Sequence, residues 1–214
     1  MRHRFIAAAA AATLIVGSGC ALAGAYVAPG TSLESVKSGT YVIDNSHTNV
    51  LFSLSHMGYS HYYGRFNVIE GTLNFDAKAP EKSKLDVKVD IASVDTNSHK
   101  LEEELRGPSW FDAAKFPKAT FTSTKVEKIS DTKGKVTGDL TIHGVTKPVV
   151  LDVTLNGAGQ NPLMAVPELG FSATTQIKRS DFGIAQYIPM VGDDVTLTIE
   201  SELHLPADTK ADKK

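Results

Sequence analysis

Three histidines, His47, His56 and His61, lie within fifteen residues of one another. Imidazole nitrogens serve as metal ligands and as general bases, so such a group would suit a metal centre or a hydrolytic site. From Thr48 to His56, however, apolar and polar residues alternate, which is typical of a strand with one apolar face. Side chains nine positions apart on a strand point to opposite faces, so His47 and His56 cannot share a ligand. We therefore expect no three-histidine metal site, and we expect His56 to point inward with Val50.

Two other pairs of side chains could do chemistry. His99 and Glu103 are one helical turn apart and could chelate a metal, but a zinc-protease pattern needs a second histidine, so a solvated helix face is expected. Arg179 and Asp181 share the parity of Phe171 along the chain, and both point inward if that face is inward. Buried charges need partners. We therefore expect a mutual ion pair that closes one end of the interior, or contact with the polar head of a ligand.

The usual signatures of an enzyme do not stand out in this sequence. No serine lies in a G-x-S-x-G turn, and no Ser-His-Asp arrangement, paired-carboxylate motif or phosphate-binding loop is recognisable. We therefore expect a protein that is not an enzyme, with no catalytic residue and no metal.

Residues 1–23 have the pattern of a secretory signal peptide. Arg2 and Arg4 precede an apolar run that is too short to span a bilayer, and small residues ending at Ala23 fit a cleavage site. The expected location is the periplasm or the exterior, with lipid attachment at Cys20 as the alternative. Cleavage after Ala23 would leave a chain without cysteine, and hence without a disulfide.

Composition narrows the class of partner. The 214 residues carry a formal net charge of −2 and no basic patch, so nucleic acid is not expected. No second long apolar stretch follows the signal peptide, so we expect no transmembrane span. Residues 24–39 are interpreted as a leader, 40–206 as one domain and 207–214 as a solvated tail, because no Pro/Gly/Ser-rich linker divides the chain.

Short alternating segments separated by turn-rich stretches indicate an all-β protein with an antiparallel sheet. The sequence lacks the alternation of strands and helices that is typical of a parallel sheet. A closed or nearly closed antiparallel barrel is therefore expected, with an interior that can be filled or can hold one small ligand. The candidate strands are residues 40–44, 50–56, 64–69, 72–76, 84–91, 119–128, 135–142, 149–156, 171–178 and 194–204.

One segment departs from the strand pattern. Asn97 or Ser98 can cap a short helix that carries Leu101 and Leu105 one turn apart and stops at Gly107-Pro108. An aromatic-rich loop with Trp110 and Phe111 follows. We expect this helix and loop to lie over an end or a side of the barrel as a lid.

Several stretches together resemble the YceI family of polyisoprenoid-binding proteins, from about Tyr41 to Leu205. They are "YVIDNSHTNVLFSLSHMGYSHYYGRF", "GTLNFDAKAPEKS", "SWFDAAKFPKATFTST", "GDLTIHGVTKPVVLDV" and "IKRSDFGI". The resemblance implies a lipocalin-like antiparallel barrel, usually periplasmic, that encloses a long isoprenoid or similar amphiphile. One departure concerns the lid. Glutamates stand where the family pattern R-D-x-H-L-R has Asp and His, so an anionic head group is disfavoured beside Glu102–Glu104.

The expected function is to bind and sequester, or carry, a long-chain isoprenoid, either polyprenyl or quinone-like, with no cofactor other than this lipid. A homodimer is left open. Two alternatives also stay open: a secreted hydrolase or metalloenzyme that uses His56 or His61, and a structural or stress-related barrel filled by its own side chains. The candidate ligand-binding residues are Phe52, Leu54, His56, Phe66, Leu105, Trp110, Phe111, Phe121, Ile142, Phe171, Arg179 and Phe182.

Overall fold

The computed structural model describes residues 28–33 and 36–207 of the chain. The expected signal peptide and Cys20 lie outside the described residues, as does all but the first residue of the expected tail. Among the residues described, no helix is long and apolar enough to cross a membrane.

Strands and short helical turns make up most of the described chain. The strands are β1 (Gly39–Ile43), β2 (Asn49–His56), β3 (Ser60–Phe66), β4 (Ile69–Phe75), β5 (Lys84–Asp90), β6 (Val94–Asp95), β7 (Lys118–Lys128), β8 (Lys133–Ile142), β9 (Val145–Gln160), β10 (Pro167–Lys178) and β11 (Val191–His204). The helical elements are α1 (His99–Arg106) and the 3-10 turns η2 (Asn45–His47), η3 (Pro80–Lys82), η4 (Ile91–Ser93) and η5 (Arg179–Phe182).

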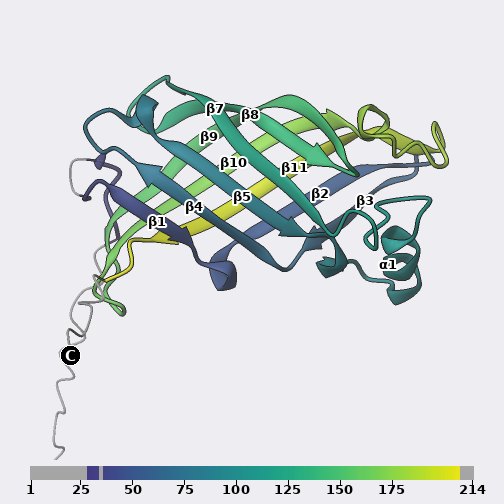
Figure 1. Ribbon diagram of the computed structural model, residues 1–214, viewed down its shortest axis with the longest axis horizontal. Coiled ribbons are helices and arrows are strands. Elements are labelled where there is room, and N and C mark those ends of the chain that lie inside the picture. Colours follow the sequence, from purple (N-terminus) through teal and green to yellow (C-terminus); the bar gives the residue numbers. More distant parts are fainter. Residues whose placement is uncertain (1–27, 34–35, 208–214) are drawn as a thin grey trace, which may run out of the picture.

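The strands close into an antiparallel barrel. Eight of them form a ring in the order β1-β4-β5-β7-β8-β9-β10-β11, which closes where Val42 and Ile43 of β1 pair with His204 and Leu203 of β11. Strand β2 pairs with the rest of β11, and β3 and β6 follow beside it. Figure 1 shows the elongated barrel that results. The predicted all-β antiparallel barrel is confirmed.

Three wall strands are each broken into two segments, and the breaks lie next to one another. Asn45 in η2 donates its amide to the carbonyl of Asn67 and accepts from the backbone N–H of Ile69. Ser93 in η4 accepts from the backbone N–H groups of Asn67 and Val68. Because the chain breaks at Asn67 and Val68, the predicted single strand 64–69 is wrong: β3 stops at Phe66 and β4 starts at Ile69.

The segment before β1 belongs to the fold, although it was expected to be a leader outside it. Gly30 forms a β-bridge with Ala158, and Val36 is buried. Val36 packs with Tyr41 and Leu169 in a cluster that closes the barrel at the end where β1 begins. The apolar residues of the segment before β1 therefore contribute to the core.

The short helix α1 lies at the opposite end of the barrel, beside β3 (Figure 1). The Ser98 side chain accepts from the backbone N–H of Leu101 and so caps the helix, and Gly107 ends it. Leu105 points from α1 into a buried cluster with Trp110. The predicted helix and aromatic loop are therefore present at a barrel end.

Candidate functional site

The interior contains an apolar cavity of about 260 Å³. Inward-facing side chains of the barrel strands line it, among them Phe171 and Ala173 of β10 and Ile199 of β11. Among the described residues, all the charged ones in the lining belong to one stretch at the β7–β8 turn: Glu127, Lys128, Asp131 and Lys133. Because charged side chains face water, we place the mouth of the cavity at this turn.

The other half of the barrel is filled by the protein's own side chains. We call this cluster the plug. Phe52 and Phe66 pack within it with ring centroids 5.8 Å apart, and Phe66 contacts Phe111 edge-on at 5.7 Å. The buried members of the plug are Phe52, Phe66, Ile91, Val94, Leu105, Trp110, Ala119, Ile184 and Val195.

The sequence-predicted ligand residues divide between the two halves. Phe121 and Phe171 line the cavity. The other ten are not among its lining residues. Seven of those ten belong to the plug or pack against it: Phe52, Leu54, Phe66, Leu105, Trp110, Phe111 and Ile142.

His56 does not point into the interior, which corrects our expectation. The inward parity holds at Val50, which lines the cavity, and at Phe52, which is buried in the plug. His56 is the last residue of β2, immediately before the turn to β3, and it is exposed there. His61 is exposed as well. Within residues 28–33 and 36–207, no group of three or more His, Cys, Asp or Glu side chains is arranged to hold a metal ion.

Arg179 and Asp181 do not form the expected ion pair. Arg179 is buried and donates to four backbone carbonyls, those of Gly192, Ile184, Gln186 and Val191, at 2.8 to 3.0 Å. Its guanidinium also lies over the Trp110 ring, 5.4 Å from the centroid. Asp181 is exposed, because β10 ends at Lys178 and the alternation stops in η5.

Arg179 stabilises a loop at the plugged end of the barrel. Burial lowers the pKa of the guanidinium from its ordinary value, yet arginine stays charged in proteins. Its carbonyl acceptors all belong to residues 184–192, so Arg179 fixes this loop to the barrel. Phe182, also in η5, is buried but does not line the cavity.

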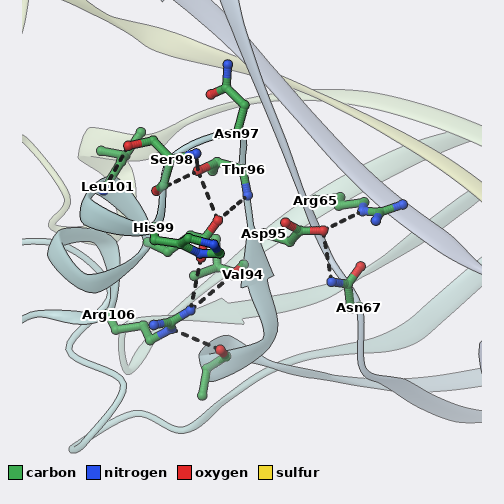
Figure 2. A network of polar contacts seen from close by, with 12 residues as sticks. Arg65, Asn67, Val94, Asp95, Thr96, Asn97, Ser98, His99, Leu101 and Arg106 are labelled. Carbon is green, nitrogen blue, oxygen red and sulfur yellow. Dashed lines mark hydrogen bonds and ion pairs between the residues drawn. The ribbon is translucent and has the colours of Figure 1, made fainter.

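The charged face of α1 holds a residue that the sequence did not reveal. His99 is fully exposed, as expected, and its ring contacts Glu102 at 3.0 Å. Glu102 is buried and accepts from the backbone N–H of Thr96, with Arg106 at 3.6 Å (Figure 2). The Thr96 N–H is the main cause that holds the pKa of Glu102 below its usual range, with His99 next. No local pattern distinguishes Glu102 from Glu103, which is exposed.

A second small network in Figure 2 fixes β3 against β6. Arg65 donates to Asp95 at 2.9 Å, and the Asn67 amide donates to the same carboxylate at 3.0 Å. These two contacts, Asn67 first, lower the pKa of Asp95. The network lies on the outside of the plugged half, so its role is to hold the wall and not to contact a ligand.

Many cavity-lining residues were missed, although a signal for them was present. The stretches "VVLDVTLN" and "VTLTIESELHL" keep their apolar residues on one parity. Those residues include Val149, Leu151, Leu197 and Ile199, all of which line the cavity. Parity identified an inward face correctly, but it does not tell how far along the barrel a residue lies.

Comparison with known proteins identifies the family. The model of the YceI-like domain matches residues 41–203. A UPF0312 protein of Pseudomonas savastanoi pv. phaseolicola is 41% identical over 165 residues, which cover 75% of this chain and 85% of that protein. Protein YceI of Escherichia coli O157:H7 is 40% identical over 173 residues, covering 80% of this chain and 90% of that protein.

Solved structures agree. The YCEI protein of Campylobacter jejuni is 38% identical with a TM-score of 0.66, over 72% of this chain and 90% of that one. A polyisoprenoid binding domain from Saccharophagus degradans shares the fold, with a TM-score of 0.60 and 16% identity, over 78% of this chain and 98% of that one. Together, the matching residues and the shared barrel show that this chain belongs to the YceI family.

Proposed function

We propose that the protein binds an amphiphilic lipid with an isoprenoid or similar chain and carries or sequesters it, without catalysing a reaction. The observation that carries this proposal is the apolar cavity inside a closed barrel, with charged residues confined to its mouth. An apolar tail gains free energy on entering such a cavity, about 0.8 kcal/mol for each CH₂ group removed from water. A charged head group stays in water among the charged residues at the mouth, whereas an uncharged polar group can enter with the chain if it finds a hydrogen-bond partner inside.

The size of the cavity limits what can enter. Pockets for small ligands usually span about 300–1,000 Å³, and this cavity of about 260 Å³ lies just below that range. It therefore suits a short chain, or the end of a long one. A long polyprenyl or quinone tail would extend through the mouth, or would require plug side chains such as Phe52 to move.

The pattern of residues 1–23 supports a location of the protein outside the cytoplasm. Their signal-peptide pattern fits export to the periplasm or the exterior, where an insoluble lipid needs a carrier to cross water. A filled barrel with a structural role is the second candidate, and the plug favours it because half of the interior is already occupied.

Native mass spectrometry of protein purified without detergent tests the proposal. We expect a co-purifying species with an apolar chain, which organic extraction and fragmentation would identify. A barrel that carries no lipid and takes up none on addition would favour the structural role. A stoichiometric transition metal in place of a lipid would favour the metalloenzyme.

A matched pair of variants ties the bound lipid to the cavity. Ala173 is buried and lines the cavity, whereas its neighbour Thr174 is exposed on the outer face of β10. Ala173→Phe should fill the cavity and abolish lipid uptake, while Thr174→Phe should leave uptake unchanged. Circular dichroism checks that both variants fold. Equal uptake by a folded Ala173→Phe protein would show that the lipid binds elsewhere.

A further inference from the structure

A pair of hydroxyl groups stands in the wall of the otherwise apolar interior. Thr48 Oγ1 and Ser201 Oγ lie 3.0 Å apart, and both residues line the cavity. Thr48 is only 6% exposed. It follows η2, at the break between β1 and β2, and Ser201 lies on the neighbouring strand β11. Their neighbours in the lining include Val50, Ile199 and Leu203.

The pair has a hydrogen-bond donor left over. Two hydroxyls carry two O–H groups, and their mutual bond uses one of them. The second O–H is not used by that bond. Val50, Ile199 and Leu203 in the lining are aliphatic and offer this O–H no acceptor. An oxygen atom on a bound molecule is the group that would satisfy it.

We propose that the Thr48–Ser201 hydroxyl pair is a subsite for a hydroxyl or carbonyl oxygen of the cargo. This rests on the proposed function and names the chemical class of ligand: an isoprenoid-like chain that carries an oxygen, as opposed to a plain hydrocarbon. The charged mouth at the β7–β8 turn lies on strands opposite β1 and β11 in the ring. The subsite therefore binds an oxygen that enters the barrel with the apolar chain, not one that stays at the mouth.

Two ten-carbon isoprenoids that differ in oxygen content provide the test. Geraniol carries a terminal hydroxyl, and myrcene is the corresponding hydrocarbon. Each is used to displace the uncharged fluorescent dye N-phenyl-1-naphthylamine from the protein. For each ligand, the dissociation constant of the variant is divided by that of the wild type. The hydration of the free ligand cancels in this ratio, so a difference between the two ligands reports the contribution of the subsite.

We expect the double variant Thr48→Val/Ser201→Ala, which removes both hydroxyls, to weaken geraniol binding about tenfold, the factor expected for one lost hydrogen bond. Myrcene binding should change by less than about twofold, because valine keeps the shape of threonine and alanine that of serine, each without the hydroxyl. Thr48→Val or Ser201→Ala alone leaves one hydroxyl that still donates to the cargo, so each single variant should weaken geraniol binding less than the double variant does. Thr175→Val is the matched control, since Thr175 also lines the cavity but lies outside the pair.

Each other outcome would overturn the proposal in a distinguishable way. Equal weakening of geraniol and myrcene by a folded double variant means that the pair only shapes the wall. An equal loss of preference in Thr175→Val means that general polarity, and not the pair, selects the ligand. If the double variant does not fold, Thr48→Ala/Ser201→Ala takes its place and should lose the preference for geraniol, whereas Thr48→Ser, which keeps both hydroxyls, should keep it. If wild type binds neither the dye nor either isoprenoid, the proposed function itself fails.

Discussion

Glu102 shows how a single carboxylate can organise the approach to α1. It accepts from the Thr96 N–H at 3.0 Å, 8% of its side chain is exposed, and it lies between His99 and Arg106. Its pKa is lowered, which means that the folded state prefers the ionised form. For a carboxyl with a depressed pKa, the stabilisation is present above the unfolded value of about 4.3. It is lost as the pH falls through the lower, folded value.

Replacing Glu102 tests this at the scale of one residue. We expect Glu102→Gln to lower the thermal midpoint by a few degrees at pH 7, because glutamine keeps an acceptor for Thr96 but loses the charge facing His99 and Arg106. The difference from wild type should shrink as the pH falls below the ordinary glutamate pKa of about 4.3 and through the lower pKa that Glu102 has in the folded state. Thermal melts from pH 7 to pH 3 measure this, with the exposed Glu103→Gln as control. A difference that stays constant over that range would contradict the role of the charge.

The loop formed by residues 184–192 depends on one side chain. Arg179 occupies the carbonyls of Ile184, Gln186, Val191 and Gly192, and no shorter or less branched side chain presents donors in that fork. We expect Arg179→Lys to destabilise the protein by about 3 kcal/mol or more, because several buried carbonyls lose their donor. Urea denaturation measures the change.

The same substitution at Arg65 is the control for that element. Arg65 forms an exposed ion pair with Asp95, and such pairs contribute about 0–1 kcal/mol. Arg65→Lys should therefore have a small effect. Similar losses at Arg65 and Arg179 would show that the carbonyl contacts of Arg179 are not what holds the loop.

Strand existence and inward parity could be predicted from the sequence, because alternation depends only on neighbouring residues. Val50, Phe52 and Phe171 followed the expected side of their strands. The position of the cavity along the barrel could not be predicted, because it depends on which distant side chains meet. Phe52 fails to line the cavity since Phe66, Phe111 and other plug residues surround it.

Local geometry at the ends of strands was the other source of error. His56 continues the inward parity of β2 but lies at the end of the wall, so it meets water. Asp181 appeared to continue the parity of β10, yet the chain had already turned into η5. Neither His56 nor Asp181 is a glycine or proline that would mark the end of a strand in the sequence. The surrounding fold decides where each strand ends.

At the scale of the whole molecule, the barrel has one hollow half and one filled half. Ligand binding should therefore protect the two halves unequally in hydrogen exchange. With geraniol present at 100 times its dissociation constant, linkage gives about 2.7 kcal/mol of added stability. We expect slower local exchange at the β7–β8 turn, which lines the mouth, and no local change in α1 or residues 107–117.

The opposite pattern would restore the role first assigned to the lid. Slower exchange confined to α1, together with a change in Trp110 emission, would mean that the ligand enters the plug and not the cavity. Trp110 suits this measurement because it is the single tryptophan and is buried beside Arg179.

The ring closes between strands that are far apart in the sequence, and this has a consequence for the order of folding. The other ring pairings join strands close together in the chain, whereas Val42 must find His204 and β2 must find β11. Contacts of such long separation cost the most chain entropy and form late. The hydroxyls of Thr48 and Ser201 meet across this last pairing. A partly folded chain thus has no complete cavity, so cargo acts by slowing unfolding and does not guide the chain toward its fold.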